Sequence, residues 1–240
     1  MQGLVRDFTV EEFRQLVHEG RVDWRFVEGE KHYLDRFAET LIATHADLAA
    51  RQLDPPAPAA LARERRRRIH DQMDLVVNVA CEPADWQRDL DLLDEQPKIY
   101  GAAALHPNDA KLYTPELWEN LRTVLRHPKM VAVGETGLDY YWDDATPEEQ
   151  QALFIRHIEL AKELGKPLII HDRAAHQDTL DMLRSHGAQE VGGVLHAFSG
   201  SWEMAKLVLN LNFYIALGGP VTFKNASKPL EVARNVPLDR

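Results

Sequence analysis

The stretch MVAVGETGLDYYWDDATPEEQQALFIRHIELAKELGKPLII, residues 130–170, contains one complete strand–helix–strand unit. Its first part, residues 130–133, is a short apolar and β-branched run of strand type. Residues 147–164 then place apolar side chains at helical spacing, with a Thr-Pro pair at the start and a glycine at the end. Residues 167–170 begin a second strand. The unit predicts two parallel strands joined by a helix.

The same alternation runs along the chain from about residue 74 onward. Strands are predicted at 75–79, 99–105, 130–133, 167–170, 193–195 and 213–217, and helices at 84–95, 115–126, 147–164, 175–186 and 201–211. Strands that alternate with single helices predict a parallel sheet covered by helices. Because no glycine-rich dinucleotide loop is present, the series favours a TIM-like (β/α) barrel over an open sheet.

The N-terminal part of the chain does not show this regular alternation of strands and helices. Helical periodicity is strong at 9–19 and at about 32–53, and a proline-rich break at 53–58 follows. No Gly/Ser-rich linker and no internal repeat divides the chain. We therefore predict a helical extension over residues 1–40, followed by the barrel over residues 41–240.

The composition is ordinary for a soluble globular protein, with 45% hydrophobic and 28% charged residues. The single cysteine, Cys81, excludes an internal disulfide framework and fits a reducing compartment. Without a membrane-length apolar run or a secretory signal, a cytoplasmic protein with no membrane partner is predicted. The net charge of −10 disfavours broad electrostatic binding of nucleic acid, although bound divalent cations would reverse the local charge. The oligomeric state stays open.

Side chains that bind metals follow four of the predicted strands: His106, Glu135, His171 and His196. The carboxyl ends of parallel barrel strands gather at one face, so these side chains are expected to converge. One histidine after a strand is more often structural. Four imidazole and carboxylate groups at the same topological position predict a divalent-metal site.

Four motifs carry a resemblance to a known family: GETGLDYY (134–141), PLIIHDR (167–173), LHAFSGS (195–201) and GPVTFK (219–224). Together they resemble the TatD-type metal-dependent hydrolases over roughly residues 74–240. The resemblance implies a TIM-like barrel that hydrolyses phosphodiester bonds, as a 3′–5′ DNA exonuclease acting on single-stranded DNA or 3′ ends. It also implies two divalent ions (Mg, Mn or Zn) bridged by Glu135, with His171 and His196 completing the ligands of the second ion.

The chain departs from this family at the first ion. The family binds that ion with a His-x-His pair, for which His45 and Asp47 are the nearest candidates here. His45 also shares a helical face with apolar neighbours, so an ordinary amphipathic helix is an equal alternative. The sequence ends before the last family strand, which bears a metal-binding aspartate. An incomplete barrel without its last βα unit is therefore expected, with as few as one bound ion.

Catalysis is assigned to Glu135 and Asp139. The glycines on either side of Glu135 are expected to let metal and substrate approach the backbone closely. Asp139 is expected to orient the attacking water or a metal ligand, and a loop or helix cap is the equal alternative. His106 is expected to lie near the ions without binding them.

Several residues are candidates for substrate binding. Arg173 would meet a phosphate, the alternative being a surface ion pair. Ser199, in a Ser-Gly-Ser sequence that opens a helix, would present backbone N–H groups to an anion, or the sequence simply caps that helix. Lys224 would contact the substrate backbone. The aromatic run 140–142 could stack on bases, although packing is the commoner role of such side chains.

Three functions are therefore considered. The first is the TatD-like nuclease. The second is an impaired remnant that binds one ion or a phosphorylated ligand without efficient turnover. The third is an amidohydrolase-like esterase or amidase, against which the GETGLD and FSGS motifs argue.

Overall fold

A computed structural model describes residues 27–28, 76–218, 221, 225–237 and 240. Within these residues the strands form one parallel sheet in the order β1 to β7, so each strand pairs with its neighbour in sequence. The strands are β1 (Val27–Glu28), β2 (Val76–Ala80), β3 (Ile99–Ala103), β4 (Met130–Asp139), β5 (Leu168–Arg173), β6 (Gly193–Leu195) and β7 (Phe213–Ile215). This arrangement confirms the predicted parallel sheet and its alternation with helices.

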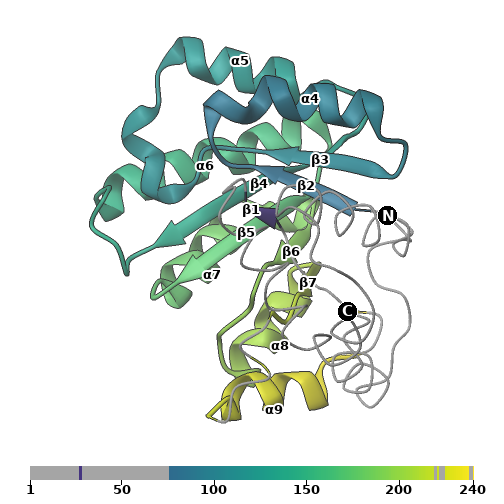
Figure 1. Cartoon of the computed structure of the whole chain (residues 1–240). Coiled ribbons are helices and arrows are strands. Elements are labelled where there is room, and N and C mark those ends of the chain that lie inside the picture. The colour runs from purple at the N-terminus through teal and green to yellow at the C-terminus, as the bar shows by residue number, and fades with distance from the viewer. Residues whose placement is uncertain (1–26, 29–75, 219–220, 222–224, 238–239) are drawn as a thin grey trace, which may run out of the picture.

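The helices lie along the outside of the curved sheet (Figure 1). They are α4 (Trp86–Glu95), α5 (Pro115–Leu125), α6 (Pro147–Leu164), α7 (His176–Ser185), α8 (Trp202–Asn210) and α9 (Ser227–Asn235), with 3-10 turns η1 (Pro83–Asp85), η2 (Pro107–Leu112) and η3 (Ala188–Glu190). Each strand from β2 to β6 is followed by a helix, as a (β/α) barrel requires. In the described ranges, no helix has both the length and the apolar character needed to cross a bilayer.

Both ends of α6 are formed by the residues that the sequence places there, Thr146 at the start and Gly165 at the end. The Thr146 hydroxyl accepts a hydrogen bond from the backbone N–H of Glu149, and the Glu149 carboxylate accepts one from the N–H of Thr146. This reciprocal pair is a capping box, which satisfies N–H groups that the helix leaves free. At the other end Gly165 adopts a left-handed conformation with φ of 62°.

Apolar side chains pack on both faces of the sheet. A small cluster on the inner face includes Val77, Val79 and Ala102, while their neighbours Ala80 and Ala103 face the larger core beneath the helices. This alternation is the two-residue period of a strand. Both faces are therefore buried, which explains the nearly continuous apolar strands in the sequence.

The observed elements differ from the predicted ones in several places, mostly at their ends. Strands β4 and β5 extend beyond the predicted ends, and α9 follows β7 where no helix was predicted. Residues 27–28 form a strand paired with β2, although they fall within the predicted helical extension. The predicted helices at 9–19 and 32–53 lie outside the described residues, and the domain division at residue 40 stays a prediction.

Candidate metal centre

Glu135 lies within β4 and not after it, which corrects the expectation that the strand ends before this residue. Val133 pairs with Leu168 and Thr136 with Ile170, so β4 uses one more residue than β5 over this interval. The extra residue is a β-bulge, and bulges next to active sites redirect side chains. Glu135 is completely buried as a result of its position in the sheet.

The glycines at 134 and 137 let β4 pack closely against β5, and their predicted role in the approach of metal or substrate stays a prediction. A Cβ atom on Gly134 would lie 2.5 Å from the Cβ of Ile169. A Cβ atom on Gly137, where φ is +136°, would lie 2.0 Å from the carbonyl oxygen of His171. No side chain fits at these distances, so glycine lets the two strands meet where His171 is placed.

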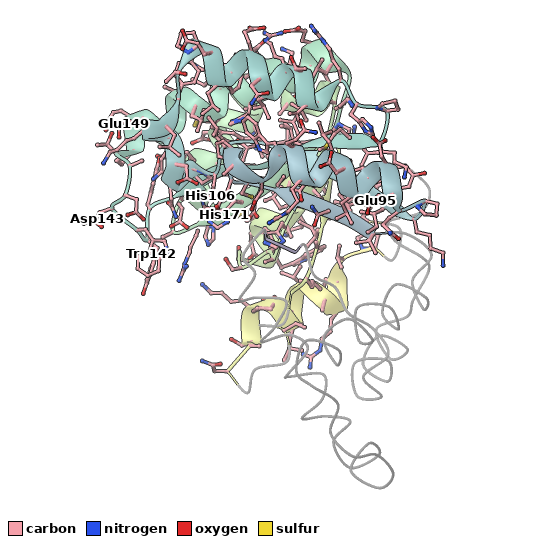
Figure 2. All side chains as sticks on the ribbon, turned by 45° about the horizontal axis from the view of Figure 1, so that its top comes forward. Glu95, His106, Trp142, Asp143, Glu149 and His171 are labelled. Carbon is pink, nitrogen blue, oxygen red and sulfur yellow. The ribbon has the colours of Figure 1, made fainter. Side chains whose placement is uncertain are left out.

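Three histidines surround the Glu135 carboxylate. Its Oε1 atom lies 2.9 Å from Nδ1 of His171 and 3.4 Å from Nε2 of His196. The rings of His106 and His171 are 4.7 Å apart between centroids, and Figure 2 shows the two side chains together. One ligand atom each from His106, Glu135 and His171 lies within 4.8 Å of the others. The predicted convergence of strand-end residues is therefore present in the structure.

His171 bridges two carboxylates, which favour its protonated form. Its Nδ1 atom bonds Glu135 and its Nε2 atom bonds Asp139 Oδ2 at 2.8 Å. Burial lowers the pKa of His171, but the hydrogen bonds and charges of Asp139 and Glu135 outweigh burial and raise it to about 9. Burial likewise raises the pKa of Glu135, while His171 and His196 bring it down to about 2. The centre is therefore built to hold positive charge between carboxylates.

The other two histidines remain neutral. Burial, together with the charge of His171, lowers the pKa of His106 to about 4, and burial lowers the pKa of His196. A neutral imidazole keeps a lone pair for a metal ion. In addition, Glu135 Oε2 is buried and has no hydrogen-bond partner among the described residues. These donors fit a divalent ion, because imidazole and carboxylate ligands suit Zn, Mn and similar metals.

His106 lies next to Glu135 and His171, near the predicted ion site. It follows β3 and begins η2, where its Nδ1 atom accepts a hydrogen bond from the N–H of Asn108 at 3.3 Å. The expectation put His106 beside the ions without binding them. The structure groups it with Glu135 and His171 as a potential ligand, and whether it binds an ion stays a prediction.

Asp139 combines the two roles that the sequence left open. Its Oδ2 atom bonds His171, while Oδ1 accepts hydrogen bonds from the N–H groups of Tyr141 at 3.0 Å and Trp142 at 3.4 Å. The hydrogen bonds from the loop and from His171 offset burial and lower the pKa of this carboxyl. Asp139 thus orients His171 and shapes the following loop at the same time.

Two buried residues of α6 support the centre and were not identified from the sequence as site residues. Gln150 accepts a hydrogen bond from the backbone N–H of Asp139 and donates one to its carbonyl oxygen, both at 2.8 Å. His157 accepts from the N–H of Leu105 at 3.3 Å, and its Nδ1 atom lies 2.9 Å from the Thr136 hydroxyl. A signal was present, since both residues fall on the apolar stripe of the predicted helix.

Arg173 lies at the end of β5, opposite Asp139 in the sheet. Its guanidinium carbon is 3.9 Å from the ring centroid of Tyr141 and 5.6 Å from that of Trp142. Among the described residues no carboxylate pairs with it, so the alternative of a surface ion pair finds no support there. Tyr140, in contrast, is packed against the core, and its hydroxyl donates to Asp178 at 2.8 Å.

Of the remaining candidates, the structure describes Ser199, which makes no hydrogen bond to the residues of this centre. Ser199 is exposed, and the neighbouring Ser201 caps α8 by accepting a hydrogen bond from the N–H of Met204 at 3.3 Å. The capping alternative therefore holds for Ser201. His45, Asp47 and Lys224 lie outside the described residues, so their predicted roles stay predictions.

Sequence comparison finds relatives with similar descriptions. YabD of Bacillus subtilis (strain 168), an uncharacterized metal-dependent hydrolase, is 40% identical over 200 residues, which cover 83% of this chain and 77% of YabD. YcfH of Escherichia coli (strain K12), described in the same words, is 43% identical over 150 residues, or 62% of this chain. The chain spans only 56% of YcfH, about half of its length.

Solved structures support the same fold. The crystal structure of YjjV, a TatD homologue from Escherichia coli K12, matches with a TM-score of 0.68 and 32% identity, over 77% of this chain and 71% of YjjV. A TatD family hydrolase from Entamoeba histolytica shares the fold with a TM-score of 0.63 at 20% identity, over 72% of this chain and 60% of its own. The predicted TIM-like (β/α) architecture is thereby confirmed.

The family profile described as TatD related DNase matches residues 42–240, which include every residue of the centre. The relatives named as metal-dependent hydrolases agree with the cluster of histidines around a buried glutamate. On this combined evidence, the chain is a metal-dependent hydrolase that belongs to the TatD related DNase family.

Proposed function

We propose that this chain hydrolyses phosphodiester bonds of DNA with the help of divalent metal, removing nucleotides from 3′ ends or single strands. The observation that carries the proposal is the buried Glu135 carboxylate, which has one unpartnered oxygen and three histidines around it. The description of the family as DNases supports DNA as the substrate. The single cysteine supports a cytoplasmic location.

Each residue of the centre has a distinct part in this proposal. Glu135, His171 and His196 would hold metal, with His106 as a further ligand, and the ion would take the place of the His171 proton that faces it. A bound divalent ion lowers the pKa of a coordinated water and polarises a phosphoryl oxygen. Asp139 keeps His171 in position through the hydrogen bond to Nε2. Arg173 offers a guanidinium that can bind a phosphate oxygen pair.

The proposal is tested by release of nucleotides from single-stranded DNA with Mg²⁺ or Mn²⁺. We expect Glu135→Gln to reduce the rate by at least about 100-fold, because an amide binds metal poorly and cannot carry the negative charge. Glu116→Gln is the matched control, since this glutamate is exposed at the start of α5. Full activity of Glu135→Gln would contradict the assignment of the centre.

Metal content separates the proposed enzyme from the impaired remnant. Elemental analysis that finds close to two ions per chain supports the complete centre of the family. One ion or fewer, together with no nucleotide release, would favour the remnant. The two measurements are independent, because metal content does not require turnover.

A further inference from the structure

Two large aromatic side chains lie exposed immediately after the centre. Tyr141 is 59% exposed and Trp142 is 50% exposed, whereas the adjacent Tyr140 is packed against the core. Figure 2 shows Trp142 projecting from the ribbon beyond the loop, beside Asp143. Adjacent exposed aromatic rings leave a sizeable apolar surface in water, and such surfaces mark binding sites.

The loop backbone fixes this aromatic pair to the metal centre. The backbone N–H groups of Tyr141 and Trp142 both donate to Oδ1 of Asp139, whose other oxygen bonds His171. The two rings meet edge to face, with centroids 4.8 Å apart and an interplanar angle of 89°. Because one carboxylate joins the loop to a potential metal ligand, the backbone that carries the rings is held next to the centre.

The charges around the pair differ from one side to the other. Arg173 lies over the Tyr141 ring at 3.9 Å and has no carboxylate partner among the residues that the structure describes. Asp143 and Asp144, which follow Trp142 directly, are exposed. A phosphate is therefore attracted on the Arg173 side and repelled on the Asp143 side. The Trp142 indole, 5.6 Å from the guanidinium carbon of Arg173, presents a surface suited to a flat and uncharged group.

We propose that Tyr141 and Trp142 form a platform on which an unpaired nucleobase of the substrate stacks, chiefly against Trp142, while Arg173 binds the adjacent phosphate. The inference rests on the proposed hydrolysis of DNA and adds how the strand is recognised. Stacking on an aromatic side chain tolerates any base, because every base has a π-face. A base paired within a duplex is stacked on its neighbours, so the platform favours single strands.

Binding measured without turnover tests this inference. Isothermal titration calorimetry in EDTA would use unlabelled oligothymidylate and the same sugar–phosphate chain without bases, since a dye could itself stack on Trp142. We expect Trp142→Ala to weaken oligothymidylate binding on the order of 10-fold. Its binding of the abasic chain should not change, and Trp142→Phe should restore most of the affinity. Leu207→Ala, at a residue that is 40% exposed on α8, is the control.

The outcomes separate this inference from the proposed function. If Trp142→Ala binds both chains as the wild type does, or if the wild type does not distinguish them, the platform is refuted, even where Glu135-dependent hydrolysis is present. If the base-dependent loss is seen but the wild type releases no nucleotide with Mn²⁺, the platform stands and the hydrolysis fails. A Trp142→Ala variant that alters only self-association, measured by sedimentation, would instead assign the rings to a protein contact and overturn the inference.

Discussion

At the scale of single residues, Asp139 connects the centre to the following loop and to helix α6. It bonds His171 with one oxygen and two loop N–H groups with the other, and its own backbone is held by Gln150. At 1% exposure it has almost no contact with water, so solvent screens its negative charge on His171 only weakly. The consequence is a histidine whose ring orientation depends on a residue that need not touch metal.

Asp139→Asn should therefore weaken activity without abolishing it. The amide keeps a hydrogen bond to His171 but removes the charge, so we expect a loss of roughly 10- to 100-fold in activity or metal affinity. Metal titration with and without substrate measures this. Asp181→Asn, at an exposed position of α7, provides the matched control. An unchanged metal affinity and rate in Asp139→Asn would remove this residue from the site.

Among elements, β4 and β5 decide the geometry of the centre. The bulge in β4 places Glu135 beside His171, and glycine at 134 and 137 lets the strands approach. The glycines of the GETGLD motif are therefore required for the close packing of β4 against β5. The same short motif thus carries both the metal-binding candidate Glu135 and the glycines that allow the strands to pack.

Gly137 and Gly165 both have positive φ, but an added side chain would overlap other atoms only at Gly137. Alanine substitutions at the two positions therefore separate the cost of backbone strain from the cost of steric overlap. At Gly165 an added Cβ meets nothing within 4 Å, so Gly165→Ala should cost only the left-handed conformation, about 1 kcal/mol. At Gly137 the Cβ would overlap the His171 carbonyl, so Gly137→Ala should cost about 3 kcal/mol. Thermal unfolding of the two variants provides the comparison. Equal destabilisation would show that the close approach of β4 and β5 is not required.

At the scale of the whole molecule, His157 connects three elements beneath the centre. From α6 it reaches the N–H of Leu105 after β3 and the hydroxyl of Thr136 in β4. Since the N–H of Leu105 can only donate, Nε2 accepts and Nδ1 carries the proton that bonds Thr136. Burial lowers the pKa of this fully buried imidazole to about 3. Leu105 and Thr136 directly adjoin the site residues His106 and Glu135 in sequence. Their hydrogen bonds to residue 157 therefore require that histidine to be neutral.

This arrangement predicts acid sensitivity. Between the unfolded pKa of about 6.5 and the folded pKa of about 3, the unfolded chain binds a proton at residue 157 that the folded chain does not. The stability contributed by neutral His157 is complete above pH 6.5 and declines as the pH falls. We expect this residue to account for a decline on the order of 3 kcal/mol by pH 4.

Urea unfolding of wild type and His157→Gln at pH 7.5, 5.5 and 4.5 measures the effect. Glutamine can still accept from Leu105 but does not titrate, so the variant should be the less stable protein at pH 7.5 and approach the wild type at low pH. Thr136→Val is the control, because it removes one hydrogen bond and keeps the titrating imidazole. If the free energy of unfolding falls with pH by the same amount in His157→Gln and in wild type, the prediction is contradicted.

Local patterns were sufficient for much of the fold. The periodicity of residues 147–164 predicted α6 to the residue, because its caps and apolar stripe are local features. Residues 134–139 lack such a pattern, so the continuation of β4 past Val133 could not be seen. The side chains of Gln150 and His157 were likewise visible on the apolar stripe, but their partners lie on other elements.

The sequence by itself determined the alternation of strands and helices and the identity of the candidate metal-binding residues in the second halves of strands or just after them. It also carried the motifs that place the chain in its family. Only the tertiary structure decided that Glu135 lies in a bulge, that His171 bonds two carboxylates, and that His106 joins the cluster. These facts depend on the register between strands far apart in sequence, which no local pattern specifies, since a shift of one residue turns every side chain to the other face.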